Sequence, residues 1–234
     1  MPDSSHARSL AHAKDEILKA AIPHVLFDGW VDSVITLAVN ETGIDENLVL
    51  EAFPRGAIDL ALFYHASGDC AMVKALAAAD LDTLRFSEKV AYAVQARLEI
   101  ADKEAVRRGL TLFALPQNAT DGVSALWSTV DTIWTALGDT DDDVNWYTKR
   151  ATLSGVYSAT VLYWLGDESE SNVDTWAFLN RRIENVMQFE KVKSAFKKSP
   201  LGPIFDGATQ WIKAPNPDHK SMYPGYTGGD HSDH

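Results

Sequence analysis

The side chains that most often carry out catalysis are present in this sequence, but they are not spaced for it. The chain has seven histidines, 33 acidic residues and a single cysteine, Cys70, among 234 residues. It contains no Walker A, GxGxxG, GxSxG or HExxH pattern, and no Glu-x-x-His pair of the ferritin type. One cysteine also excludes a disulfide framework and a cysteine-rich zinc site. We therefore expect no catalytic residue, no metal site and no cofactor.

A second kind of chemistry, recognition of a protein partner, is indicated at an aromatic pair near a helix start. The acidic run Asp141–Asp143 can cap a helix, because carboxylates stabilise its positive end. Trp146 and Tyr147 follow within about one turn, and neighbours on a helix point about 100° apart, so both rings should not be fully buried together. An exposed Trp/Tyr pair beside Asp143 and two basic residues has the composition of a binding hot spot. The alternative is that these rings belong to the core.

A third candidate is membrane contact by the segment 199–213, SPLGPIFDGATQWIK. Ser199 can cap a helix here, and Pro200 and Pro203 fit only its first turn. An apolar face, an interfacial tryptophan and flanking lysines are typical of a helix that lies in a membrane surface. Alternatively, this helix folds back as a lid or a dimer element. The apolar face comprises Leu201, Ile204, Phe205, Ala208, Trp211 and Ile212, and the lysines before it are Lys193, Lys197 and Lys198.

The elements that carry these residues are predicted to be helices throughout. Apolar residues recur at i, i+3, i+4 and i+7 over 123–137 and 173–187, whereas alternating strand patterns are nearly absent. Glycines and prolines divide the chain into about ten helices. We expect an all-α domain over 7–198, the amphipathic helix 199–213, and a disordered tail over 214–234 that is too polar to fold.

The N-terminal part, residues 14–63, is predicted to form a helix-turn-helix. One helix should end near Gly29, a second should run from Asp32 to Asn40, and a third from Asp45 to Phe53, with Asp32 and Asp45 as N-caps. The Thr42-Gly43 break gives the tight turn. This part resembles the N-terminal domain of TetR-family regulators in the arrangement of Ile17, Leu18, Ala20, Ala21, Phe27, Gly29, Ala38, Gly43 and Phe53.

The charges of this helix-turn-helix oppose DNA binding. Residues 36–53 contain Glu41, Asp45, Glu46 and Glu51 but no lysine or arginine, and the whole chain has a formal net charge of -12. Phosphate contacts need cations that replace condensed counterions. We therefore expect no nucleic-acid partner and interpret this part as a scaffold. The only basic zone is 181–213, with seven Lys/Arg against three Asp/Glu, which fits an anionic partner or a solvated helix face.

The segment 138–183 carries a resemblance to a specific family. It resembles the ubiquinone-biosynthesis accessory family often called Coq-nine, and the resemblance extends over about residues 14–213. Several tryptophans at fixed spacing make it fairly specific. The matching elements are Asp143, Asn145-Trp146-Tyr147-Thr148-Lys149-Arg150, Val156-Tyr157, Asp167, Ser169, Asp174-Thr175-Trp176, Phe178-Leu179 and Arg182.

The resemblance implies a protein with a TetR-like fold that has lost DNA binding and acts as a membrane-associated, lipid-binding helper. It binds an isoprenoid or quinone lipid and presents polyprenylated quinone intermediates to a hydroxylase of the ubiquinone pathway. The resemblance also implies a homodimer. The family's partner-docking patch falls on Asp143, Trp146 and Tyr147 of this chain. Two alternatives remain: a TetR-type ligand-responsive transcription regulator, and a helical adaptor without a lipid.

A prenyl tail needs an apolar cavity with few polar groups. The resemblance places a cavity among the helices of 123–137, 153–164 and 173–187, without saying which side chains line it. Aromatic side chains at helical spacing belong more often to a plain core. Our candidates for the lining are Leu153, Val156, Tyr157, Trp164, Trp176 and Phe178.

The first residues, MPDSSHARSLAHAK, lack the apolar stretch of a secretory signal and are only weakly rich in arginine. The resemblance implies that a mitochondrial member of the family carries a presequence. We therefore expect a cytoplasmic, bacterial-like protein, peripheral on the inner membrane and without a transit peptide.

Overall fold

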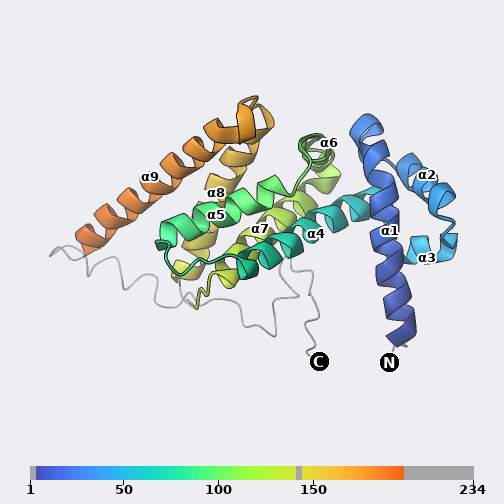
Figure 1. The fold of residues 1–234 in the computed structure, drawn as a ribbon, viewed down its shortest axis with the longest axis horizontal. Helices are drawn as coiled ribbons and strands as arrows, with labels where there is room; N and C mark the ends of the chain where they lie inside the picture. The colour runs from blue at the N-terminus through green and yellow to red at the C-terminus, as the bar shows by residue number, and fades with distance from the viewer. Residues whose placement is uncertain (1–3, 141–143, 198–234) are drawn as a thin grey trace. The chain divides into compact units, whose positions relative to one another are not determined.

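The computed structural model describes residues 4–140 and 144–197, with the side chains of the last turns of α9 left out (Figure 1). These residues form nine α-helices and two short 3-10 helices, and no strand occurs among them, so the all-α prediction is confirmed. The helices are α1 Ser4–Asp28, α2 Asp32–Thr42, α3 Glu46–Ala52, α4 Ala57–Ala78, α5 Phe86–Glu99, α6 Lys103–Phe113, η1 Pro116–Asn118, α7 Ala119–Ala136, α8 Val144–Leu165, η2 Glu170–Asn172 and α9 Val173–Lys197.

The described chain divides into two compact units. The first contains the residues up to 70 together with 100–125, and the second contains 71–99 together with the residues from 126 onward. Two helices, α4 and α7, contribute residues to both units. The predicted domain limits 7–198, 199–213 and 214–234 stay a prediction, because the last two segments lie outside the residues that the structure describes.

The helix-turn-helix of the first unit follows the predicted order. After α1, Gly29 adopts a left-handed φ of +80°, and Gly43 ends α2 with a φ of +66°, donating its amide to the carbonyl of Val39. Asp45 caps α3 as predicted, accepting hydrogen bonds from the amides of Asn47 at 2.9 Å and Leu48 at 3.3 Å. These side-chain bonds satisfy two of the free amides at the helix start.

The prediction that Asp32 caps α2 is wrong. The residue before α2 is Val31, and no side chain caps that helix. The Asp32 carboxylate instead accepts a hydrogen bond from the amide of Ala57 at 2.8 Å, at the first residue of α4. It caps a helix that begins 25 residues later, because the fold brings the starts of α2 and α4 together.

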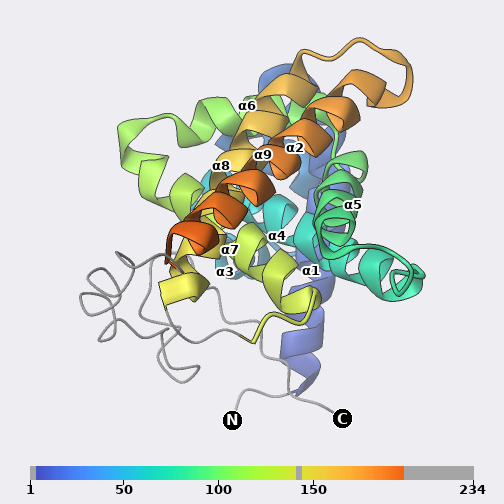
Figure 2. The same ribbon diagram turned by 90° about the vertical axis from the view of Figure 1, so that its left-hand side faces the viewer.

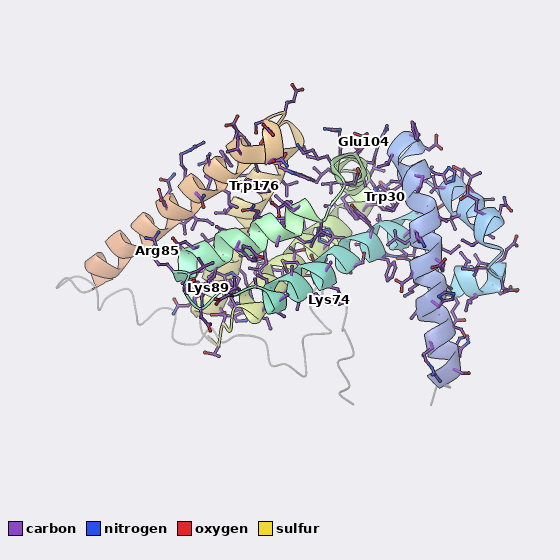
Figure 3. The ribbon with its side chains drawn as sticks, viewed as in Figure 1. Trp30, Lys74, Arg85, Lys89, Glu104 and Trp176 are labelled. Atoms are coloured by element: carbon purple, nitrogen blue, oxygen red, sulfur yellow. The ribbon has the colours of Figure 1, made fainter. Side chains whose placement is uncertain are left out.

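Apolar faces of α1, α2, α3 and α6 form the core of the first unit. Trp30, which is labelled in Figure 3, anchors α6 there. Its indole Nε1 donates to the carbonyl of Ala105 at 3.0 Å. Its ring also packs on Tyr64 of α4 at a centroid distance of 5.3 Å. Other buried members of this core are Ile17, Ala21, Val25, Val34, Ala38, Val49, Ala52, Phe53 and Leu60.

In the second unit, α9 packs along α8 and also contacts α5 (Figure 2). Asp167 organises the turn between α8 and α9, accepting hydrogen bonds from the amides of Ser169 at 2.8 Å and Thr175 at 2.9 Å. The side chains of Ser169 and Thr175 hold the pKa of this carboxyl well below its ordinary value. The buried core of this unit includes Val130, Ile133, Trp134, Leu153, Val156, Tyr157, Val161, Trp164, Leu179 and Ile183.

None of the helices in 4–140 and 144–197 has the combination of length and apolar character needed to cross a membrane.

Candidate functional site

The aromatic pair predicted to dock a partner lies in the first turn of α8. Trp146 and Tyr147 pack edge to face, with ring centroids 4.8 Å apart. Only 9% of Trp146 is exposed, whereas Tyr147 is half-buried. The two rings are therefore not fully buried together, as predicted, but the expectation that Trp146 is exposed is wrong. Asp143, the third predicted member, lies outside the described residues.

The reason for the burial of Trp146 is that its neighbours cover the ring. Trp127 of α7 lies beside it, with centroids 6.0 Å apart and ring planes inclined at 53°. The guanidinium carbon of Arg150 lies 4.0 Å from the centroid of the same ring. Arg150 stands four residues after Trp146, so one helical turn brings the cation over the indole, where the ring quadrupole attracts it.

The guanidinium of Arg150 is itself buried, with 3% of the side chain exposed. Its Nε donates to Asp131 Oδ1 at 2.6 Å, and its Nη1 donates to Asp139 Oδ2 at 3.0 Å and to the carbonyl of Trp146 at 3.2 Å. These acceptors come from α7, from the loop after α7 and from α8. A buried cation costs much to desolvate unless it is paired and hydrogen-bonded, and Arg150 is both.

Asp139 is the shared anion of this cluster. Its side chain is 3% exposed and also accepts a hydrogen bond from Lys149 Nζ at 2.7 Å. Burial by itself raises the pKa of the Asp139 carboxyl, but the hydrogen bonds from Lys149 and Arg150 outweigh it, so that the pKa lies below its ordinary value. Lys149 Nζ also lies 5.2 Å from the ring centroid of Trp134.

Sequence reasoning missed this ion cluster, although one signal was available. The four-residue step from Trp146 to Arg150 places a cation and an aromatic ring on one helix face. The partners Asp131 and Asp139 are 19 and 11 residues away, and no local pattern connects them to Arg150.

The six candidates for the lipid site all lie on α8 and α9 but in different environments. Leu153, Val156, Tyr157 and Trp164 are buried in the core of the second unit. The two others are half-buried: Phe178 stacks on Tyr163 at 4.5 Å, and Trp176 donates its Nε1 to the carbonyl of Ser171 at 2.9 Å. Their role as a lipid lining stays a prediction.

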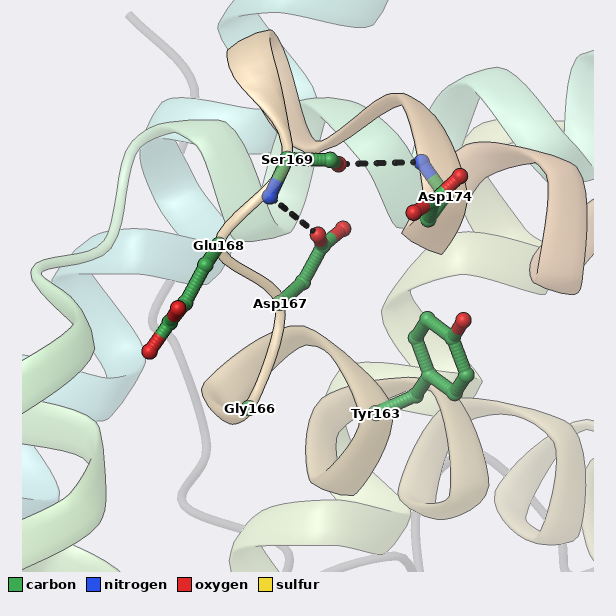
Figure 4. Close-up of a pocket in the computed structure, with 6 residues that line it drawn as sticks. All are labelled: Tyr163, Gly166, Asp167, Glu168, Ser169 and Asp174. Atoms are coloured by element: carbon green, nitrogen blue, oxygen red, sulfur yellow. Dashed lines mark hydrogen bonds between the residues drawn. The ribbon is translucent and has the colours of Figure 1, made fainter.

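A hollow of about 530 Å³ lies at the turn between α8 and α9 (Figure 4). None of the six lipid candidates lines it, and three of its residues are acidic. A surface with that many carboxylates does not suit a prenyl tail, which needs apolar walls. The lining residues are Tyr163, Gly166, Asp167, Glu168, Ser169 and Asp174.

The predicted membrane-binding residues fall outside what the structure describes. Lys197 is the last residue of α9, and its side chain is not described. The remaining ones are Lys198, Leu201, Ile204, Phe205, Trp211 and Ile212, all beyond the described residues. Among the residues that are described, no group of three or more His, Cys, Asp or Glu side chains is placed to hold a metal ion.

Two acidic residues on the surface of the helix-turn-helix contact histidines of α1. His24 pairs with Glu41 of α2 at 2.7 Å, and His6 pairs with Glu51 of α3 at 2.9 Å. Glu46 and Leu50 of α3 are exposed. The absence of a nucleic-acid partner stays a prediction, which these acidic positions support.

Comparison with known proteins gives a match to the COQ9 family model over residues 119–190, which include α7, α8 and the aromatic pair. The COQ9 ubiquinone biosynthesis protein of Drosophila melanogaster is 30% identical over 185 residues, 76% of this chain and 56% of that protein. The chain is thus similar in sequence to a COQ9 protein over about three quarters of its length. The human COQ9 protein is 31% identical over 180 residues, 73% of this chain and 56% of the human protein. The resemblance carried by the segment 138–183 is thereby confirmed.

The COQ9 relatives are longer than the part that matches. The alignments cover little more than half of the Drosophila and human proteins, and 61% of the Xenopus tropicalis protein, which is 32% identical over 79% of this chain. These relatives are named as mitochondrial proteins. That finding contradicts the prediction of a cytoplasmic, bacterial-like protein on the inner membrane, which was based on the composition of the first residues.

A solved structure of another protein has a similar fold. That protein is a TetR transcriptional regulator from Nitrosomonas europaea, and the match has a TM-score of 0.60 and 19% sequence identity and covers 74% of this chain and 96% of that one. The TetR-like fold is therefore confirmed. At this identity the likeness concerns the fold alone, since one fold hosts many functions.

Proposed function

We propose that this chain is a non-catalytic accessory protein of ubiquinone biosynthesis. On this proposal it binds an isoprenoid or quinone lipid at a membrane surface and presents the polyprenylated intermediate to a hydroxylase. The observation that carries the proposal is the homology to COQ9 proteins, which extends over 73% to 79% of this chain in the human, Drosophila and Xenopus tropicalis comparisons. The homodimer implied by the family belongs to the same proposal.

The lipid is expected among the helices of the second unit. There, α8 buries an uncharged face from Leu153 to Trp164, and on this proposal its small residues Ser158, Ala159 and Thr160 leave room for the ligand. Apolar pockets between helices are a common place for hydrophobic ligands. The half-buried Trp176 and Phe178 would then meet the same ligand from α9.

Organic extraction of the purified full chain, followed by mass spectrometry, tests lipid binding directly. We expect a quinone or an isoprenoid to co-purify in a fixed ratio to protein. Val156→Phe, which enlarges a buried side chain of α8, should lower that ratio. The matched control is Leu162→Phe on the same helix, where the side chain is 66% exposed. Absence of any lipid from the wild-type chain would contradict the proposal and favour a plain helical adaptor.

The hydroxylase is proposed to dock on the start of α8, at Asp143, Trp146 and Tyr147. Aromatic residues dominate the energy of most protein interfaces, and this pair lies at a helix end. Trp146→Lys should abolish capture of the purified pathway hydroxylase while the helical circular dichroism is retained. Because Trp146 is buried, Tyr147→Ala serves as a second variant that disturbs the core less. Full binding by both variants would remove this surface from the proposal.

A further inference from the structure

We propose that Arg150 is a positioning residue of this docking surface, holding the Trp146 ring inward so that Tyr147 is the aromatic side chain that meets the partner. This inference rests on the proposed docking of a hydroxylase at the start of α8. It assigns different roles to two neighbouring residues, where their types alone would make both contact residues.

The first support is the hydrogen bonding of Arg150. A guanidinium can donate in its own plane to several acceptors while its face lies on an aromatic ring. Arg150 does both: it binds Asp131 at 2.6 Å and Asp139 at 3.0 Å, and it lies 4.0 Å from the Trp146 ring centroid. Its position is thus fixed by two carboxylates that belong to α7 and the following loop.

The second support is the covering of Trp146 on more than one side. The ring has Arg150 at 4.0 Å, Trp127 at 6.0 Å and the edge contact with Tyr147 at 4.8 Å. With 9% of the residue exposed, Trp146 has little surface left for a partner. Tyr147 is more exposed and rests against the fixed indole, so the indole determines where the tyrosine ring points.

The third support is the carbonyl of Trp146, which accepts a hydrogen bond from Arg150 Nη1 at 3.2 Å. The same guanidinium therefore restrains both the ring and the backbone of the residue that precedes Tyr147. A lysine at 150 would keep the positive charge, but a single ammonium group cannot lie flat on the indole and reach both carboxylates.

The test is the affinity of the full chain for the purified pathway hydroxylase, measured by titration calorimetry. Arg150→Lys should weaken binding about tenfold or more, as should Tyr147→Ala. The matched control is Arg182→Lys: Arg182 lies 4.9 Å from the ring centroid of Phe178 on α9, so the same chemical change is made at another cation–aromatic contact. That control should stay within about twofold of the wild type.

A double-mutant cycle separates positioning from general loss of structure. If Arg150 acts through Tyr147, the double variant should bind no more weakly than Tyr147→Ala alone, because the two changes remove the same interaction. Additive losses would show a merely structural role and overturn the inference. The lipid-to-protein ratio of Arg150→Lys should equal that of the wild type.

The outcomes also separate this inference from the proposed function. Wild-type affinity in Arg150→Lys together with weak binding in Tyr147→Ala would overturn the positioning role and leave the docking surface in place. Wild-type affinity in both variants would remove the docking surface itself. If Arg150→Lys does not fold, Asp131→Asn takes its place: it keeps Arg150 but weakens the 2.6 Å ion pair, and it should lower the affinity several-fold.

Discussion

The carboxylate of Asp32 and the amide of Ala57 form a 2.8 Å hydrogen bond that joins the start of α2 to the start of α4. Gly56, immediately before Ala57, has a left-handed φ of +66°. A Cβ atom at position 56 would collide with the Asp32 carboxylate. The chain therefore needs glycine here for two independent reasons, its backbone conformation and the space taken by the capping side chain.

Gly56→Ala should lower the free energy of unfolding by about 2–4 kcal/mol. Of this, about 1–2 kcal/mol comes from the left-handed conformation, and the rest comes from displacing the carboxylate that caps α4. Urea unfolding followed by circular dichroism measures the loss.

Gly138→Ala is the matched control for this prediction. Gly138 has a φ of +80°, but no atom lies within 4 Å of a Cβ built there. The free energy of unfolding should then fall only by the cost of the left-handed conformation, about 1–2 kcal/mol. Equal losses in the two variants would show that the Asp32 contact contributes nothing at position 56.

The two caps of the helix-turn-helix show which structural features the sequence could predict. Asp45 caps through amides two and three residues ahead, so its role follows from local sequence. Asp32 is also an aspartate at the start of a predicted helix, but its carboxylate accepts a hydrogen bond from the amide of Ala57, 25 residues away. Helix positions were predictable because their apolar periodicity is local, whereas the partner of Asp32 depends on how the helices pack.

The same distinction holds at the candidate site. Residue types near a helix start identified Trp146 and Tyr147 as unusual, and family resemblance gave them a role. Which ring turns inward depends on Trp127 and Asp131 of α7, which pack on α8 only in the folded chain. Periodicity likewise predicted that Val130 and Leu179 lie on the apolar faces of helices, where both are buried, but it cannot tell a packed core from the wall of a cavity.

Asp139→Asn should destabilise the second unit by about 1.5–3 kcal/mol at pH 7, because Lys149 and Arg150 lose the charged acceptor of their hydrogen bonds. The pKa of Asp139 is lower in the folded chain than its ordinary value, owing to Lys149 and Arg150. A carboxyl of this kind stabilises the fold above its ordinary pKa of about 3.9. Its contribution is lost as the pH falls towards the lowered folded value.

Urea unfolding of wild type and Asp139→Asn at several pH values between neutral and acidic measures this. The difference in free energy of unfolding between the two chains should be largest near pH 7. It should shrink as the solution is acidified below about pH 4, near the ordinary pKa of an aspartate. Asp82→Asn, at an exposed position, is the control and should behave like the wild type throughout. A difference that grows on acidification would contradict the predicted sign.

The full chain should not retard duplex DNA in a mobility-shift experiment, even at low salt. The exposed positions of α3 include Glu46 and Glu51, and residues 36–53 contain no lysine or arginine to replace counterions. The double variant Glu46→Lys/Glu51→Lys is a useful comparison, since it should gain weak, salt-sensitive and sequence-independent binding. Sequence-specific retardation by the wild type would restore the transcription-regulator alternative.

The segment 199–213 is predicted to bind membranes, and co-sedimentation with vesicles tests it. The full chain should sediment with vesicles that contain an anionic lipid, and removal of residues 199–234 should abolish this. Burial of each large apolar side chain contributes about 1.5–3 kcal/mol when complete and less on partial insertion, so the loss should be large. Unchanged sedimentation after the truncation would exclude this segment as the membrane contact.

A charge variant distinguishes electrostatic from apolar binding in the same experiment. Each lysine near an anionic leaflet contributes about 1 kcal/mol, so Lys197→Gln/Lys198→Gln should lower the affinity for anionic vesicles by about tenfold or more. Its affinity for neutral phosphatidylcholine vesicles should not change, because the substitutions leave the predicted apolar face with Phe205 and Trp211 unaltered. Equal losses on both vesicle types would mean that the lysines act by supporting the helix, because attraction to an anionic leaflet would leave neutral vesicles unaffected.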